Sequence, residues 1–188
     1  MMRLRTAALA AFIVAGSGAA ALVAGQQPAA GEKLTPDQIF ELHTKQDQGG
    51  QAEAGRPIFE QQCAICHRFG TLGKEVGPDL TTLTSRFQKK DILEAILWPS
   101  KVISDQYKSE MFQLTSGKII TGVVVRETAA SVLVRTPEMP ERPVSIPKAQ
   151  IAVRGESKVS MMPEGLLDGY SQADVANLLA FLMAPPPG

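Results

Sequence analysis

Both cysteines of this 188-residue chain lie in one pentapeptide, CAICH, as Cys63 and Cys66, directly before His67. A C-x-x-C pair can form a redox disulfide, supply half of a zinc site, or anchor a c-type haem. The histidine favours the third chemistry, because C-x-x-C-H is the haem-attachment spacing. Residues three apart share one face of a helical turn, so each thiol can bond one haem vinyl group while His67 ligates the iron.

The other two chemistries fit the surrounding sequence less well. A structural zinc site needs four ligands, and the only other histidine of the chain is His43. A thioredoxin-like disulfide should follow a strand in a βαβ unit, and no such pattern surrounds CAICH. For His43 an exposed side chain is the default expectation, and a role as second axial ligand is the alternative.

A sixth iron ligand can be sought among the methionines. Met161 and Met162 lie in SMMPEG, between glycine and proline signals. Neighbouring side chains of an extended loop point in opposite directions, so only one of the two can face a haem. Pro163 biases the residue before it toward an extended backbone. This favours Met162 as the ligand, with Met161 as the alternative.

Four helices are predicted to position these groups, over residues 35–46, 53–67, 87–97 and 170–183. Thr35 and Gln38 form a capping-box pattern at the start of the first, and Ser171 and Asp174 form one at the start of the last. The second helix carries CAICH. Pro99 ends the third.

Between the third and last helices the hydrophobic period changes to two. Residues 107–155 contain β-branched runs separated by turn signals, which predict four or five antiparallel strands. So small a meander is marginal alone, and we expect it to close into a barrel or lean on the helices. The predicted fold is therefore mainly α, with a helical domain over residues 55–106 and 156–188. A small β subdomain is inserted at 107–155, and residues 26–54 form a leader with the short first helix.

The N-terminal segment reads as a secretory signal peptide over residues 1–25. Arg3 and Arg5 precede an uncharged run rich in alanine, with small residues at its end. An uncleaved membrane anchor is the alternative, because twenty uncharged residues are long enough to span a bilayer. Removing the segment leaves 17 basic and 19 acidic residues, without the clustered positive charge of a nucleic-acid surface.

The order of these motifs resembles the class I cytochromes c. More closely, it resembles a haem-binding domain family in which a β insert separates the middle helix from the methionine loop. The matching stretches are GRPIFEQQCAICHRFG, GPDLTTLTSRF, ILEAILWPSKVI and SMMPEGLLDGYSQADVANLLAFL. The resemblance implies one covalent haem c, first and last helices that cross, and electron transfer.

The resemblance also assigns further residues. It implies that the carbonyl of Pro78 accepts a hydrogen bond from the proximal His67, and that the ligand is the methionine directly before proline, Met162. Arg86 and Trp98 are candidate partners for the haem propionates. A solvated arginine and an indole packed at a helix end are the ordinary alternatives for these two residues.

The leading functional hypothesis is a periplasmic one-electron carrier between an exported dehydrogenase and an acceptor such as an oxidase or another cytochrome. Export agrees with haem c, because bacteria complete covalent haem attachment outside the cytoplasm. A haem-based gas or redox sensor, a peroxidase-type enzyme and an accessory subunit of a dehydrogenase are the alternatives. A methionine ligand argues against the sensor and the enzyme, since both need an open iron position. We expect no enzymatic activity and no nucleic-acid partner, and a membrane contact only if the signal segment is uncleaved.

Overall fold

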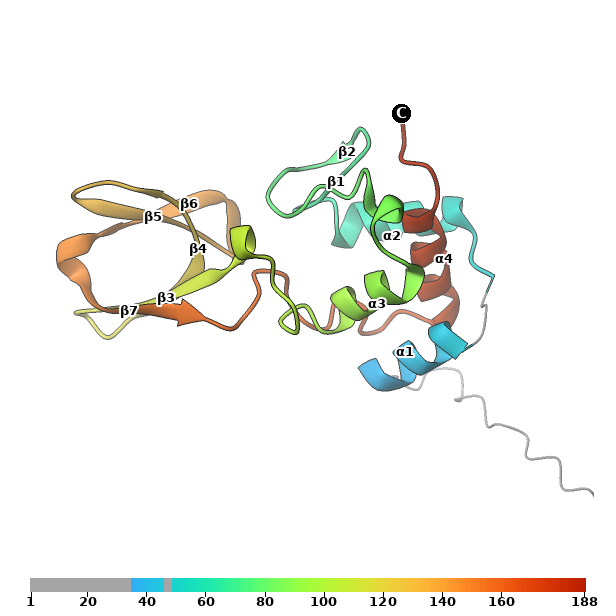
Figure 1. The fold of residues 1–188 in the computed structure, drawn as a ribbon, viewed down its shortest axis with the longest axis horizontal. Helices are drawn as coiled ribbons and strands as arrows, with labels where there is room; N and C mark the ends of the chain where they lie inside the picture. The colour runs from blue at the N-terminus through green and yellow to red at the C-terminus, as the bar shows by residue number, and fades with distance from the viewer. Residues whose placement is uncertain (1–34, 46–48) are drawn as a thin grey trace, which may run out of the picture. The chain divides into compact units, whose positions relative to one another are not determined.

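A computed structural model describes residues 35–45 and 49–188 of the chain. The expected signal peptide over residues 1–25 and the leader residues 26–34 lie outside the described residues. The α-helices in the described part are α1 (Pro36–Lys45), α2 (Ala52–Gln62), α3 (Lys89–Leu97) and α4 (Gln172–Met183). Short 3-10 turns, η1 (Leu83–Ser85), η2 (Asp105–Tyr107) and η3 (Lys148–Gln150), connect other elements (Figure 1).

The capping boxes predicted from the sequence are confirmed. In α1, the Thr35 N–H donates to Gln38 Oε1 at 2.7 Å, and the Gln38 N–H donates to Thr35 Oγ1 at 3.3 Å. In α4, the Asp174 N–H donates to Ser171 Oγ at 3.2 Å, and the Ser171 N–H donates to Asp174 Oδ2 at 3.0 Å. Each pair satisfies backbone donors that a helix start would otherwise leave open.

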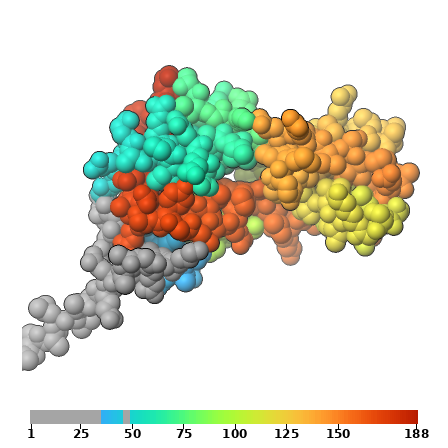
Figure 2. Space-filling model, turned by 180° about the vertical axis from the view of Figure 1, so that it is seen from behind, coloured from blue at the N-terminus to red at the C-terminus, as the bar shows by residue number. Residues whose placement is uncertain are grey.

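The first helix of the expected cytochrome-like domain, α2, packs against the last one, α4. At the crossing, the rings of Phe59 and Phe181 lie 5.4 Å apart between centroids, and Phe69 packs on both. Gly55 permits the close approach, because a Cβ there would lie 2.0 Å from the carbonyl oxygen of Asn177. The segment leading into α4 lies alongside α2, orange-red beside cyan in Figure 2, where Gln62 Nε2 donates to Tyr170 Oη at 3.0 Å.

Strands β3 to β7 form one antiparallel sheet in the order β6-β5-β4-β3-β7. They are β3 (Ser109–Leu114), β4 (Ile119–Glu127), β5 (Ser131–Thr136), β6 (Met139–Pro147) and β7 (Ile151–Ser157). Four strands form a meander, and β7 returns to pair with β3, so that Ser109 lies opposite Ser157. The predicted antiparallel strands are therefore present. A hairpin of β1 (Arg68–Phe69) and β2 (Leu72–Gly73) follows α2 and was not predicted.

The expectation of a mainly α fold is wrong. Of the described residues, 34% are helical and 27% are in strands, which makes the chain an α+β protein. The prediction failed because the α-helices have only 9 to 12 residues each, whereas two strands of the insert have 9. The inserted sheet thus contributes almost as much regular structure as all the helices.

Two separate hydrophobic clusters stabilise these elements. The larger one consists of residues from the helices and the loops between them, including the three phenylalanines of the α2–α4 crossing. The smaller one lies within the sheet and contains Phe112, Ile120, Val132, Val134 and Ile146. The helical cluster draws on residues before and after the insert, whereas the sheet cluster draws only on the insert, so the two cores share no residue.

Candidate functional site

The CAICH segment forms a single turn at the end of α2. The Cys66 N–H and the His67 N–H both donate to the carbonyl of Cys63, at 3.0 and 2.8 Å. The predicted continuation of the helix to residue 67 is wrong, because α2 ends at Gln62. The helical hydrogen bond from His67 to Cys63 nevertheless keeps the compact spacing of the motif.

Both cysteines are free thiols. Burial raises the pKa of Cys63 to about 12, and the neighbouring Cys66 adds to this effect. Burial also raises the pKa of Cys66, while the positive charges of Arg135 and Lys74 act in the opposite direction. Redox-active C-x-x-C pairs depend on a lowered thiol pKa, so this environment does not favour a disulfide oxidoreductase.

The ring of His67 is oriented by the backbone of the following loop. Its Nδ1 lies 2.8 Å from the carbonyl oxygen of Pro78, the contact that the cytochrome resemblance implies. Because a carbonyl can only accept, Nδ1 carries the proton and the lone pair of Nε2 points elsewhere. Burial lowers the pKa of His67, although the bond to Pro78 partly opposes it. His67 is therefore a neutral imidazole at pH 7, the form that ligates metals.

The loop from Gly73 to Pro78 wraps closely around the motif. The N–H groups of Val76 and Gly77 both donate to the Cys66 carbonyl, at 3.0 and 2.8 Å. A Cβ on Gly77 would lie 2.9 Å from Cε1 of His67, so only glycine lets the backbone approach the ring this closely. Sequence reasoning did not single out this glycine.

The two methionines are held in a loop fixed by serines. The Met162 N–H donates to Ser160 Oγ, and the Ser160 N–H donates to Ser100 Oγ, both at 3.1 Å. Both methionines are half-buried, and Met162 packs against the helical cluster. Met161 is not among the residues packed on that cluster. The two candidates therefore differ in their packing, and the choice of Met162 over Met161 as an iron ligand stays a prediction from the sequence.

Two candidate propionate partners lie on or near α3. Arg86 is exposed, with its guanidinium 5.4 Å from the ring centroid of Phe87. Trp98 is half-buried and forms an edge-on contact with Phe40 of α1 at 5.3 Å between centroids. These contacts describe a solvated arginine and a packed indole, and neither residue is brought beside His67 by a contact of the described chain.

The expectation of an exposed His43 is wrong. The side chain is 3% exposed, and neither ring nitrogen has a hydrogen-bond partner among the described residues. Burial and the positive charge of Lys89 lower its pKa to about 4. The amphipathic pattern of α1 places Ile39 and His43, four residues apart, on the same buried face.

Sequence reasoning missed the residues that the sheet contributes beside CAICH. Arg135 of β5 donates from Nη1 to the carbonyl of Val76 at 3.3 Å, and Glu141 of β6 forms an ion pair with Lys74 at 2.8 Å. The alternation along β5 shows that Arg135 faces away from the buried Val132 and Val134. Such a residue reads as solvent-facing, and no signal in the sequence reveals its contact with the loop.

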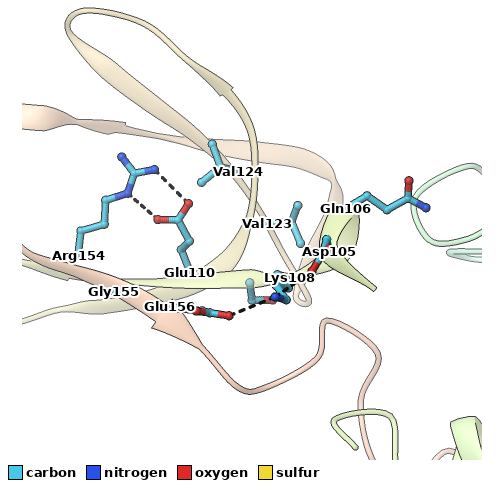
Figure 3. Close-up of a pocket in the computed structure, with 10 residues that line it drawn as sticks. Asp105, Gln106, Lys108, Glu110, Val123, Val124, Arg154, Gly155 and Glu156 are labelled. Atoms are coloured by element: carbon cyan, nitrogen blue, oxygen red, sulfur yellow. Dashed lines mark hydrogen bonds and ion pairs between the residues drawn. The ribbon is translucent and has the colours of Figure 1, made fainter. Parts of the chain in front are cut away.

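A hollow of about 630 Å³ lies on the sheet, away from CAICH in sequence (Figure 3). Arg154 points toward Glu110 and also pairs with Glu127, while Lys108 pairs with Asp105 and Glu156. Each charged group that lines the hollow therefore has a partner of opposite sign, although the three carboxylates outnumber the two basic groups.

Within the described ranges, no helix combines the length and apolar character needed to cross a bilayer. The same residues contain no cluster of three or more histidine, cysteine or acidic side chains arranged to hold a metal ion. No protein-family model matches the chain, and no curated protein matches it.

Proposed function

We propose that this protein is a mono-haem c-type cytochrome that carries single electrons between exported redox proteins. The observation that carries the proposal is the CAICH turn, in which the carbonyl of Pro78 holds His67 Nδ1 at 2.8 Å. This bond leaves Nε2 of a neutral imidazole to ligate iron.

The residues of the site fit a covalently attached haem c. Cys63 and Cys66 are free thiols three residues apart on one turn and would form the thioether bonds. His67 would be the proximal ligand and Met162 the distal one, with Met161 as the alternative. A bound haem would supply a one-electron couple at its iron.

The chain's own residues then control the properties of that couple. Pro78 fixes the orientation of His67, and Gly77 gives the loop room to do so. A thioether from Met162 favours the ferrous state and so raises the reduction potential. Arg86 and Trp98 remain candidate partners for the propionates, and α1 with His43 lies outside the part that resembles a cytochrome.

The same proposal includes a location and partners. A cleaved signal peptide over residues 1–25 would deliver the protein to the periplasm, and an uncleaved one would tether it to the membrane. The partners would be a dehydrogenase as electron donor and an oxidase or another cytochrome as acceptor.

An optical spectrum of the purified protein, oxidised and reduced, with and without carbon monoxide, tests this function. We expect covalent haem that survives denaturation, reversible cycling without a substrate, and no carbon monoxide binding to the native ferrous form. Tight carbon monoxide binding would indicate a sensor, and rapid turnover of peroxide would indicate an enzyme. Absence of covalent haem would overturn the proposal altogether.

A further inference from the structure

Arg135 lies on the inserted sheet but contributes nothing to the hydrophobic cluster of that sheet. Its neighbours Val132 and Val134 fill the core of the sheet, whereas the guanidinium of Arg135 leaves that core and donates to the carbonyl of Val76. Its Nε is buried and has no hydrogen-bond partner among the described residues. A buried donor of a charged group without a partner is unfavourable for folding, so stability alone does not explain this side chain.

The charge of Arg135 is not neutralised locally. Among the described residues, no carboxylate forms an ion pair with it, and the nearby Glu141 pairs with Lys74 at 2.8 Å. Its hydrogen bond to the Val76 carbonyl places Arg135 against the loop whose N–H groups bind the carbonyl of Cys66. One uncompensated positive charge therefore stands beside the second cysteine of CAICH.

We propose that Arg135 raises the reduction potential of the haem held by Cys63, Cys66 and His67. The inference rests on the proposed cytochrome function and extends it to a residue of the inserted sheet. The ferric site carries one more positive charge than the ferrous site, so a nearby half-buried cation disfavours oxidation. Cys66 would hold the haem through a thioether bond, and the bound haem would supply the one-electron couple on which this charge acts.

A chain of backbone contacts keeps this charge in place. Arg135 binds the Val76 carbonyl, and the N–H groups of Val76 and Gly77 bind the carbonyl of Cys66. The next residue, Pro78, accepts the hydrogen bond from His67. The sheet is thus connected through one short loop to both a haem-attachment residue and the proximal ligand.

Redox titration of the purified, haem-loaded protein tests the assignment. Arg135→Gln keeps a hydrogen-bond donor but removes the charge, and should shift the ferrous–ferric equilibrium about tenfold toward ferric, or about 59 mV for one electron. Arg135→Lys keeps the charge and should stay close to the native potential. Glu141→Gln removes a negative charge from the same cluster and should raise the potential.

Arg142→Gln is the matched control. Arg142 is exposed and follows Glu141 on β6, and in the described part of the chain no hydrogen bond or ion pair joins it to the loop around CAICH. The same loss of charge there should leave the potential unchanged. If Arg135→Gln and Arg142→Gln have equal potentials, or if Glu141→Gln lowers the potential, the inference is overturned while the cytochrome proposal stands. A native protein without covalent haem would overturn both.

Discussion

At the scale of single residues, His67 is oriented by a group that does not titrate. Many ligating histidines donate to a carboxylate, which loses its charge in acid. Here the acceptor is the carbonyl of Pro78, and Gly77 gives the loop its close approach to the ring. The orientation and basicity of the proposed proximal ligand should therefore remain constant over the pH range in which the fold is stable.

The proposed distal ligand can be identified by single substitutions. Met162→Ala should abolish the weak sulfur-to-iron absorption band of the ferric protein and lower the reduction potential, because the thioether ligand is lost. Met161→Ala is the matched control and should keep the band. The opposite pair of results would make Met161 the ligand.

His43 should make the stability of the fold depend on pH. Its pKa is lowered from 6.5 to about 4 in the folded protein, so the unfolded chain binds the proton more readily between these values. The contribution of His43 to the free energy of unfolding should therefore be constant above about pH 7 and fall as the pH decreases from 6.5 to 4, by up to about 3 kcal/mol. Urea denaturation across this range measures the slope.

His43→Leu provides the control for this prediction. The variant has no titrating group at the position and removes two buried nitrogens that lack partners among the described residues. The difference in unfolding free energy between the native protein and the variant should therefore change with pH only through the titration of His43. If the unfolding free energies of the two proteins depend on pH equally, the pKa of His43 is not lowered in the folded protein and the prediction is wrong.

At the scale of elements, the crossing of α2 and α4 should tolerate no side chain at residue 55. A Cβ on Gly55 would lie 2.0 Å from the Asn177 carbonyl oxygen and 2.5 Å from its carbon, and the backbone of a helix cannot move aside locally. Gly55→Ala should lower the free energy of unfolding by about 3 kcal/mol, more than the gain in helix propensity returns.

Gly155→Ala, a substitution of the same kind in β7, should change the free energy of unfolding by no more than about 0.5 kcal/mol, because nothing lies within 4 Å of its Cβ. Urea denaturation compares the two variants. A Gly55→Ala protein as stable as the native one would contradict the close helix crossing described here.

The elements that could be predicted from the sequence are those with strong local signals. Ser171 and Asp174 determine the start of α4 through their own side chains, and the period-two pattern of the insert predicts its strands. The hairpin of β1 and β2 has two residues per strand, too few to show any period. The expectation of a mainly α fold was wrong because it rested on the number of predicted helices, whereas the fold class depends on how many residues lie in helices and in strands.

The candidate site was predictable where its chemistry is local in sequence. Cys63, Cys66 and His67 are recognised by spacing alone, whereas the role of Pro78 came from the resemblance to the cytochromes. Arg135 was not predictable, because its contact with Val76 joins residues 59 positions apart. The burial of His43 also depends on packing between helices, since α1 contacts α3 across a long separation in sequence.

At the scale of the whole molecule, the inserted sheet should be removable without loss of covalent haem. Its hydrophobic cluster is separate from that of the helices, and its first and last strands lie side by side with Ser109 opposite Ser157. A short Gly/Ser linker in place of residues 108–156 should keep haem incorporation, weaken association with a redox partner, and lower the potential because Arg135 is lost.

Haem content by absorbance, partner binding and redox titration measure these three outcomes. The appropriate control is a protein with the same linker added at Gly117, in the β3–β4 turn, where a side chain would meet no neighbour within 4 Å. Complete loss of haem incorporation in the deletion variant alone would show that the sheet supports the haem site itself.

The pairing of Ser109 with Ser157 also affects how the chain closes on itself during folding. Helices α2 and α4 are separated by about 110 residues, and loop-closure entropy increases with the logarithm of the loop length. Once β3 and β7 have paired, the effective loop is only about half as long, which recovers roughly 0.6 kcal/mol of the entropy lost on closure. Accommodating the sheet therefore carries only a small thermodynamic penalty for the helices, provided that the sheet forms before they meet.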